Sequence, residues 1–195
     1  GASREDSEKL GLVMPRKSGD GFYDRFRNRL IFPVFDIAER PIGFGGRVLP
    51  GKDEKETAKY INSPDSPIYT KGDILFGLAQ AKRAIRTEGY AIVVEGNIDV
   101  LTLHQEGFPT TVAPMGTALT PHQVRLLKRF TEEVVLLYDG DKAGRAAAIK
   151  SLPLLLDVDL HGRVALLADG EDPDTFVRTQ GKEALEHLIK NAPPL

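Results

Sequence analysis

Four short apolar segments alternate with segments of helical periodicity from residue 88 to the end of the chain. The apolar segments are 90-YAIVVE-95, 109-PTTVA-113, 133-EVVLLYD-139 and 162-GRVALLA-168. Their apolar residues are nearly continuous, which is typical of strands buried on both faces of a parallel sheet. Strands that alternate with helices form such a sheet through right-handed crossovers. The sequence therefore predicts an α/β fold with a four-stranded parallel sheet flanked by helices.

Three of the four predicted strands are followed directly by carboxylates. Glu95 ends the first strand, with Asp99 one helical turn later, and the other acids lie in 139-DGD-141 and 169-DGEDPD-174. Functional residues of open α/β sheets gather at the carboxyl ends of the strands. Carboxylates crowded there would repel one another, and a divalent cation relieves that repulsion. The sequence therefore predicts a metal site among these carboxylates, which are Glu95, Asp99, Asp139, Asp141, Asp169, Glu171, Asp172 and Asp174.

Each acidic motif also has a structural interpretation. Asp141 could cap the helix that begins near Lys142, and Asp-Gly is a common turn. Asp172-Pro173 has the form of a helix start. The recurrence of acids at three strand ends favours the metal site over these separate interpretations. Two ions about 3.5–4 Å apart would suit phosphoryl transfer, although one ion with supporting acids satisfies the same pattern.

The N-terminal part of the chain has a different pattern. Residues 29–49 predict a β-hairpin around a turn at 38–41, and Gly43, Gly45 and Gly46 indicate a bend or a close approach of the backbone. Residues 16–71 contain 11 Lys and Arg against 8 Asp and Glu, whereas residues 88–174 contain 7 against 14. We expect a basic α+β subdomain at 1–85, an α/β domain at 86–178 and a C-terminal helical segment at 179–195.

Basic residues of the N-terminal part could bind phosphates. Arginine suits bidentate phosphate contacts and lysine acts as a point charge, although surface solvation is the simpler interpretation of any one of them. The candidates are Arg25, Arg27, Arg29, Arg47, Lys59 and Lys71.

Composition excludes several classes of protein. The chain has no cysteine, so disulfides and thiolate zinc sites are excluded, and no apolar run reaches the roughly 18 residues of a membrane span. Residues 1–20 are polar and predict a tag followed by a poorly ordered lead-in. Both ends of the chain suggest a piece of a longer protein.

Two groups of motifs resemble a known family. The segments 92-IVVEGNIDVL-101, 136-LLYDGDKAGR-145 and 166-LLADGEDPD-174 resemble the three acidic motifs of Toprim domains. The segments 23-YDRFRNRLIFPVFD-36, 42-IGFGGRVL-49 and 59-KYINSPDSPIYTKGDILFGL-78 resemble the bacterial replicative primases of the DnaG type. The chain departs from the first Toprim motif at Asn97 and Ile98, where Tyr and Met are usual, and from the third at Ala168, where Pro is frequent.

This resemblance implies synthesis of short RNA primers from ribonucleoside triphosphates on a single-stranded DNA template. It implies Mg²⁺, or Mn²⁺ in its place, at Glu95, Asp139 and Asp141. Asp172 and Asp174 would extend this metal site and Asp99 would support it. The resemblance implies catalytic roles for Arg47, Lys59 and Lys71 as well. It also implies zinc and a replicative helicase as partners of domains outside this sequence, binding of the alarmones ppGpp and pppGpp, and a cytoplasmic location at the replication fork. A Toprim topoisomerase or nuclease, and a non-catalytic nucleotide- and DNA-binding fragment, remain the alternatives.

Overall fold

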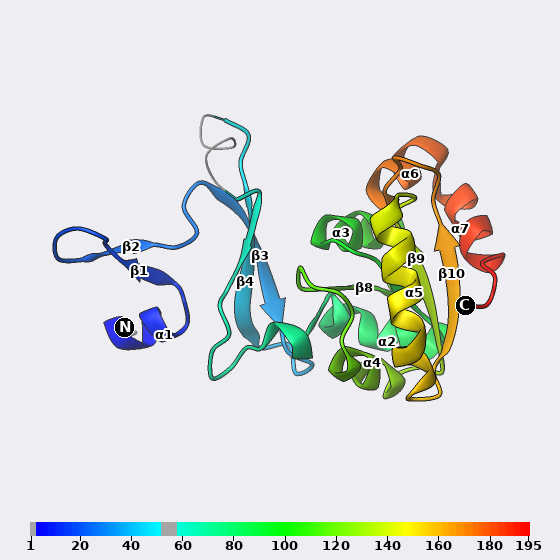
Figure 1. Ribbon diagram of the computed structural model, residues 1–195, viewed down its shortest axis with the longest axis horizontal. Coiled ribbons are helices and arrows are strands. Elements are labelled where there is room, and N and C mark those ends of the chain that lie inside the picture. Colours follow the sequence, from blue (N-terminus) through cyan, green and yellow to red (C-terminus); the bar gives the residue numbers. More distant parts are fainter. Residues whose placement is uncertain (1–2, 52–57) are drawn as a thin grey trace.

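A five-stranded sheet forms the centre of the C-terminal half of the molecule (Figure 1). The computed structural model describes residues 3–51 and 58–195. The strands lie in the order β10 (His161–Leu166), β9 (Glu133–Tyr138), β7 (Ala91–Val93), β8 (Thr111–Pro114) and β6 (Leu75–Phe76). The first four are parallel, and β6 pairs antiparallel with β8. The expected α/β fold with a parallel sheet flanked by helices is therefore confirmed.

Successive residues of each central strand enter two different hydrophobic cores. On β9, Val135 and Leu137 pack on one face of the sheet, whereas Val134 and Leu136 pack on the other. Because side chains alternate along a strand, a strand that is apolar at every position needs a helical layer on both faces. The first face is covered by α3 (Asn97–Gln105), α6 (Pro173–Gln180) and α7 (Lys182–Lys190). The second is covered by α2 (Leu78–Glu88), α4 (Pro121–Lys128) and α5 (Lys142–Leu156).

The fifth strand was missed because residues 73–87 have helical periodicity throughout. In the structure Leu75 and Phe76 pair with β8, and α2 begins only after Gly77. Gly77 has φ of 82°, a left-handed conformation that few other residues adopt and that separates the strand from the helix. Strand β6 belongs to the five-stranded sheet and α2 packs against it. The expected domain boundary between residues 85 and 86 therefore falls inside α2, a helix of the C-terminal half.

The N-terminal half contains two small antiparallel sheets. The hairpin strands β3 (Arg29–Phe35) and β4 (Pro41–Val48) are joined by β5 (Tyr60–Asn62) in the order β3-β4-β5. A smaller sheet pairs β1 (Val13–Pro15) with β2 (Phe22–Asp24), and α1 (Arg4–Lys9) precedes it. Pro33 lies on β3, an edge strand, where its missing N–H disturbs no inner ladder.

The start of the chain differs from expectation, whereas its end contains helix α7 within the expected helical segment at 179–195. The expected poorly ordered lead-in at residues 1–20 contains α1, whose N-cap Ser3 accepts a hydrogen bond from the backbone of Asp6, and strand β1. At the other end, Leu185 and Ile189 of α7 are buried in the core beneath the sheet. The expected tag lies partly outside the described residues. Most of the segment 50-PGKDEKET-57, whose charged residues predict a loop, also lies outside them.

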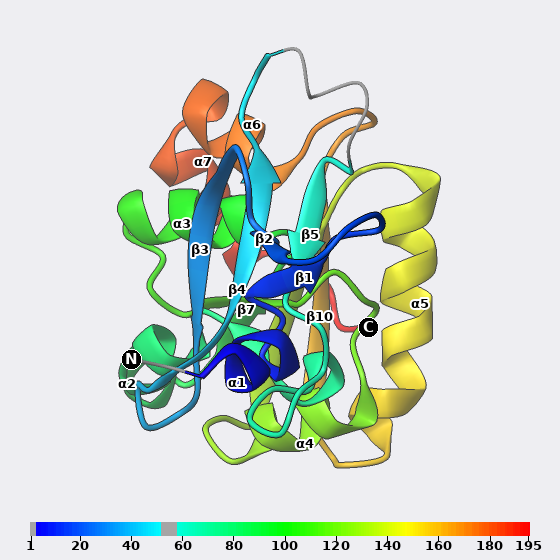
Figure 2. The ribbon, with the colours of Figure 1, turned by 90° about the vertical axis from the view of Figure 1, so that its left-hand side faces the viewer.

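The two halves share a hydrophobic core. Phe32 and Val34 of β3 and Tyr69 pack in the same cluster as the α3 face of the sheet, and the Phe32 and Phe76 rings meet edge to face with centroids 6.4 Å apart. Figure 2 shows the β3-β4-β5 sheet behind β1 and β2, with α3 and α5 to either side of it. This packing places β4 and β5 opposite the strand ends that carry the acids.

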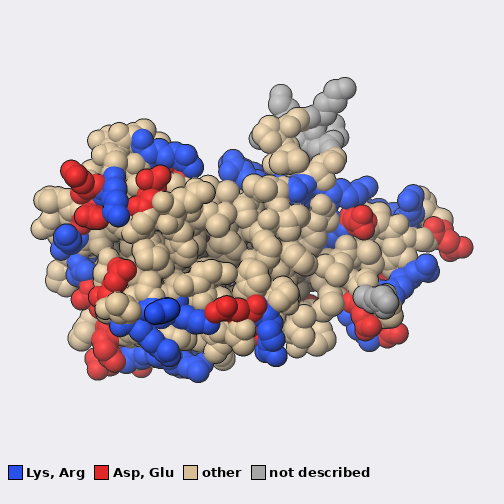
Figure 3. Space-filling view, turned by 180° about the vertical axis from the view of Figure 1, so that it is seen from behind, with Lys and Arg blue, Asp and Glu red and all other residues tan. Residues whose placement is uncertain are grey.

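Charge is more mixed on one face of the molecule than the sequence averages suggest. Figure 3, which shows the molecule from behind, has both signs of charge on both halves of that face and a wide uncharged area between them. The basic N-terminal and acidic C-terminal parts of the sequence therefore do not form two oppositely charged halves of this face. Within residues 3–51 and 58–195, no helix is long and apolar enough to cross a membrane.

Candidate functional site at the carboxyl edge of the sheet

A groove of about 440 Å³ separates the carboxyl edge of the sheet from β4 and β5. Its acidic wall comes from the segments after β7, β9 and β10, and its basic wall from β4 and the start of β5. The structure brings together seven of the candidate residues here: Arg47, Lys59, Glu95, Asp99, Asp139, Asp172 and Asp174.

Asp139 reaches the groove because two strand ends lie unusually close together. A Cβ atom at Gly140 would overlap the carbonyl oxygens of Leu167 and Ala168, so only glycine allows this approach. The Gly140 N–H also points to the carbonyl oxygen of Glu171, 3.4 Å away. The glycine between the two aspartates therefore holds the acidic loop after β10 beside Asp139.

The carboxylates raise one another's pKa. Burial raises the pKa of Glu95, and the charges of Asp139 and Asp141 add to it. Burial also raises the pKa of Asp139, with further contributions from Asp172 and Asp141. Such shifts mean that the ionised groups lack sufficient positive charge nearby, which is the condition that a bound cation would relieve.

Asp99 is the most perturbed of these acids. Burial, followed by the charges of Asp139 and Asp172, raises its pKa to about 7. Its Oδ2 accepts a hydrogen bond of 3.1 Å from the backbone N–H of Gly96, so the carboxyl also fixes the first turn of α3. This helix start presents Glu95 to the groove from the end of β7.

Asp174 is held by two neighbours. Thr102 Oγ1 donates to its Oδ1 at 2.5 Å, and Arg178 Nε donates to the same oxygen at 2.7 Å. Burial alone would raise the pKa of Asp174, but these two hydrogen bonds, with the charges of Arg178 and Arg47, lower it. Since both contacts use Oδ1, they fix the carboxylate on the groove wall without occupying Oδ2.

The basic wall is built around Tyr60. The Arg47 guanidinium lies 5.7 Å from the centre of its ring and the Lys59 ammonium 6.0 Å from it. The ring is 43% exposed, so it keeps both cations on the surface of the groove instead of burying them.

Five candidate residues lie outside the lining of the groove. Asp141 is the N-cap of α5, its Oδ1 accepting a 2.8 Å hydrogen bond from the Gly144 N–H. Arg29 donates to the carbonyl oxygens of Gly46 and Lys59 and so ties β4 to β5. The other three are Lys71, Arg25 and Arg27. Lys71 begins a 3₁₀ turn (Lys71–Asp73), and Arg25 donates to the Asn62 carbonyl oxygen at 3.3 Å. The Arg27 guanidinium stacks on the Tyr23 ring.

Sequence reasoning missed Asn62, Thr102 and Arg178. The Asn62 Nδ2 donates to the Met115 carbonyl oxygen at 3.2 Å and so joins β5 to the loop after β8 across the groove. No sequence pattern identifies this contact, because the partner is a backbone oxygen 53 residues away. Arg178 lies four residues after Asp174 on α6, a spacing at which helix residues pair, and that spacing could have found it.

A divalent cation fits the donor set of this groove. In the part of the chain that the structure describes, no three or more His, Cys, Asp or Glu side chains are already arranged to hold a metal ion. Mg²⁺ does not need such a cage, because it keeps several waters and binds through one or two carboxylates together with substrate phosphates. The carboxylates of the groove offer hard oxygen donors and raise one another's pKa. Two cations suited to phosphate lie opposite them, and this arrangement matches that mode of binding.

Comparisons with known proteins agree with this geometry. The family model for the N-terminal domain of the DNA primase catalytic core matches residues 1–82, and the Toprim-like model matches residues 92–177. The chain belongs to the DnaG primase family. A DNA primase of Aquifex aeolicus is 47% identical over 186 residues, which are 95% of this chain and 36% of that primase. The chain thus spans about a third of the length of the curated primases it matches.

Solved primase structures have the same fold. The zinc-binding and RNA polymerase domains of the Aquifex aeolicus primase match with a TM-score of 0.91 and 43% identity, covering 98% of this chain and 46% of that one. A DnaG primase catalytic domain bound to single-stranded DNA matches with a TM-score of 0.89 and 42% identity, covering 98% and 61%.

Proposed function

We propose that this chain is the catalytic centre of a primase that synthesises RNA primers from ribonucleoside triphosphates on single-stranded DNA. The observation that carries the proposal is the groove itself, in which five carboxylates face Arg47 and Lys59. A triphosphate needs cationic contacts along its length, and nucleotidyl transfer needs carboxylates for divalent ions. The match to a DnaG catalytic domain solved with single-stranded DNA supports the choice of template.

The groove residues would bind and orient the incoming nucleotide. Arg47 and Lys59 would hold its phosphates, with Tyr60 keeping both cations in place. In the reaction, the 3′-oxygen of the growing strand bonds to the α-phosphorus, the bond from that phosphorus to the β-phosphate oxygen breaks, pyrophosphate leaves, and the hydroxyl proton passes to solvent. Positioning and charge stabilisation account for most of such catalysis.

Glu95, Asp139 and Asp141 would hold the divalent ions, with Asp172 and Asp174 nearby. When bound, Mg²⁺ stabilises the charge that develops on the transferred phosphate, and Mn²⁺ would serve in its place. Asp141 would keep its capping bond to Gly144 through Oδ1, since a carboxylate has a second oxygen for another partner. Asp99 would orient the first turn of α3 and so the position of Glu95.

Other expected partners follow from the same role. The polyphosphates of ppGpp or pppGpp would compete with nucleotide for Arg47 and Lys59. Contact with a replicative helicase, and a zinc-binding module, would belong to segments outside this chain. The role in replication implies a cytoplasmic location at the fork.

Calorimetric titration with Mn²⁺ tests the metal assignment. We expect the double variant Asp139→Asn/Asp141→Asn to lose the binding isotherm of the wild type, and Asp157→Asn at the far end of α5 to keep it. Identical isotherms for the double variant and the wild type would show that the metal lies elsewhere. Primer synthesis on single-stranded DNA tests the activity, and nicking of supercoiled DNA without nucleotides would favour a topoisomerase or nuclease instead.

A further inference from the structure

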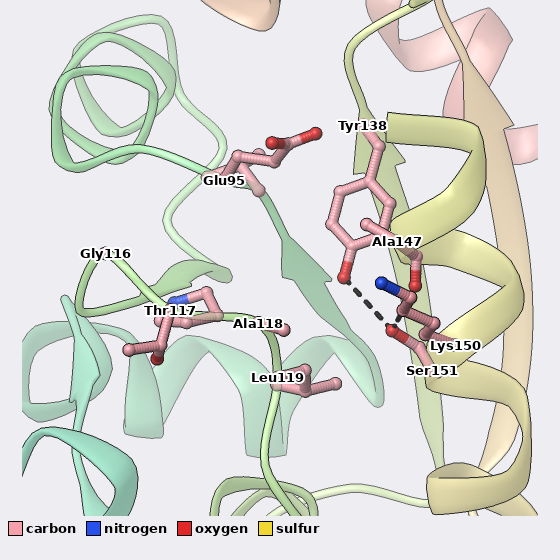
Figure 4. Close-up of a pocket in the computed structure, with 11 residues that line it drawn as sticks. Glu95, Gly116, Thr117, Ala118, Leu119, Tyr138, Ala147, Lys150 and Ser151 are labelled. Atoms are coloured by element: carbon pink, nitrogen blue, oxygen red, sulfur yellow. Dashed lines mark hydrogen bonds between the residues drawn. The ribbon is translucent and has the colours of Figure 1, made fainter. Parts of the chain in front are cut away.

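A second pocket, which we call the α5 pocket and which Figure 4 shows, adjoins the groove at Glu95. Its volume is about 370 Å³, within the range of roughly 300–1,000 Å³ that is usual for small-molecule sites. Figure 4 shows Tyr138 and helix α5 on one side, the loop from Gly116 to Leu119 on the other, and Glu95 at one end. The lining residues on which the inference depends are Glu95, Gly116, Tyr138, Ala147, Lys150 and Ser151.

The groove and the α5 pocket share two residues, Glu95 and Gly116. A ligand in one hollow and a ligand in the other would therefore meet at the Glu95 carboxylate. Nucleotidyl transfer brings two nucleotides together, and their reacting atoms must approach to about 3–3.5 Å. Two hollows that join at a predicted metal ligand provide places for both partners of such a reaction.

The two hollows differ in charge. The groove has Arg47 and Lys59, which suit the several charges of a triphosphate, whereas the α5 pocket has the single lysine Lys150. One lysine suits one phosphodiester, because it acts as a single point charge. The charges therefore assign the triphosphate to the groove and a singly charged nucleotide to the α5 pocket.

The walls of the α5 pocket suit a nucleoside. The Tyr138 ring and the aliphatic side chains around it present an apolar surface to a base. Ser151 Oγ donates to the Ala147 carbonyl oxygen at 2.9 Å and lies 3.4 Å from the Tyr138 hydroxyl, as the dashed line in Figure 4 marks. Its oxygen can still accept a hydrogen bond, which is what a ribose hydroxyl would donate.

We propose that the α5 pocket holds the 3′-terminal nucleoside of the growing RNA strand, with its 3′-hydroxyl directed to the Glu95 side. The inference rests on the proposed function and deepens it, because it assigns the second nucleotide of the reaction to residues of β9 and α5. It also assigns Lys150 to the phosphodiester that precedes the terminal nucleoside.

Two matched substitutions on α5 test the inference. Ala147→Leu adds three carbons inside the pocket, whereas Ala146→Leu makes the same change at the preceding, exposed position outside the lining. Leucine is a good helix former at both positions. We expect Ala147→Leu to raise the Kd for an RNA–DNA hybrid with a recessed RNA 3′ end at least ten-fold relative to Ala146→Leu. The Kd values for Mn²⁺-ATP and for single-stranded DNA alone should change less than two-fold.

A charge variant keeps the test valid if Ala147→Leu misfolds. Lys150 is exposed, so the substitution Lys150→Gln leaves the packing intact. We expect Lys150→Gln to raise the Kd for the hybrid three- to ten-fold. The control Lys190→Gln, also at an exposed position, should leave this Kd unchanged. If both pocket variants bind the hybrid as tightly as the wild type does, the inference is wrong. It is also wrong if the variants lose as much affinity for single-stranded DNA as for the hybrid, because that result would assign the pocket to a template base. Wild-type protein that binds neither Mn²⁺-ATP nor the hybrid would refute the proposed function itself, and the inference with it.

Discussion

Replacing Asp99 by asparagine should stabilise the metal-free protein at pH 8 and not at pH 4. Burial and the charges of Asp139 and Asp172 raise the pKa of Asp99 from its ordinary value of 3.8 to about 7. The folded state therefore binds more protons than the unfolded state between about pH 4 and pH 7, and its stability falls as the pH rises through that window. The penalty is absent below about pH 4 and complete above about pH 7.

The size of the effect follows from the two pKa values. The gap between 3.8 and about 7 corresponds to roughly 4 kcal/mol of unfolding free energy. In the Asp99→Asn variant the new amide oxygen can still accept from the Gly96 N–H, but the substitution weakens the contacts of a carboxylate, which costs about 1 kcal/mol. We expect a net stabilisation of about 2–3 kcal/mol at pH 8 and a small destabilisation at pH 4.

Urea denaturation at pH 4, 6 and 8 in the presence of a chelator measures this difference. The control is Asp20→Asn, which removes an exposed carboxylate of the N-terminal half. It should change the unfolding free energy by a similarly small amount at all three pH values. If Asp99→Asn shifts the unfolding free energy by the same amount at pH 4 and pH 8, the charge-crowding argument is wrong. Adding Mg²⁺ at pH 8 should reduce the advantage of the variant, because a bound cation relieves the same repulsion.

Two further substitutions test how the acidic wall is held. Arg178→Gln should cost under about 1 kcal/mol of stability, since exposed helical ion pairs contribute little. It should weaken Mn²⁺ binding several-fold, because only Thr102 then holds the Asp174 carboxylate in place. Arg178→Lys should recover part of the affinity, and equal affinity in all three proteins would refute this positioning role. Gly140→Ala should cost more than about 2 kcal/mol and abolish Mn²⁺ binding, because the added carbon overlaps the Ala168 carbonyl oxygen. Gly72→Ala, which meets only ordinary van der Waals contact, is its control, and similar melting curves for the two variants would contradict the argument.

The sequence predicted the sheet well because its signals are local. Continuous apolar segments predicted the strands, and α5 begins where expected, at Lys142, because its cap Asp141 directly precedes it. The two-residue strand β6 was missed because two residues are too short to interrupt a helical pattern. The acids were found because they follow those strands directly, at the edge where the structure forms the groove.

The basic residues were harder to place because their positions depend on folding between distant segments. Arg25, Arg27 and Arg29 are as basic in sequence as Arg47, yet Arg29 binds backbone oxygens within its own sheet. Which arginine faces the groove depends on how β4 and β5 pack against the other half, and local sequence patterns do not show that packing. The same holds for Asn62, whose partner lies on the opposite wall.

The shared hydrophobic core has a consequence for attempts to divide the molecule. Phe32, Val34 and Tyr69 come from the N-terminal half but are buried with the sheet of the other, and β6 extends that sheet from before the predicted boundary. A Toprim segment expressed alone from residue 86 would lose the edge strand and most of α2, expose β8 and leave an apolar face open to water. Such a truncated protein should aggregate or bind a dye such as ANS, and the intact chain should melt in a single transition.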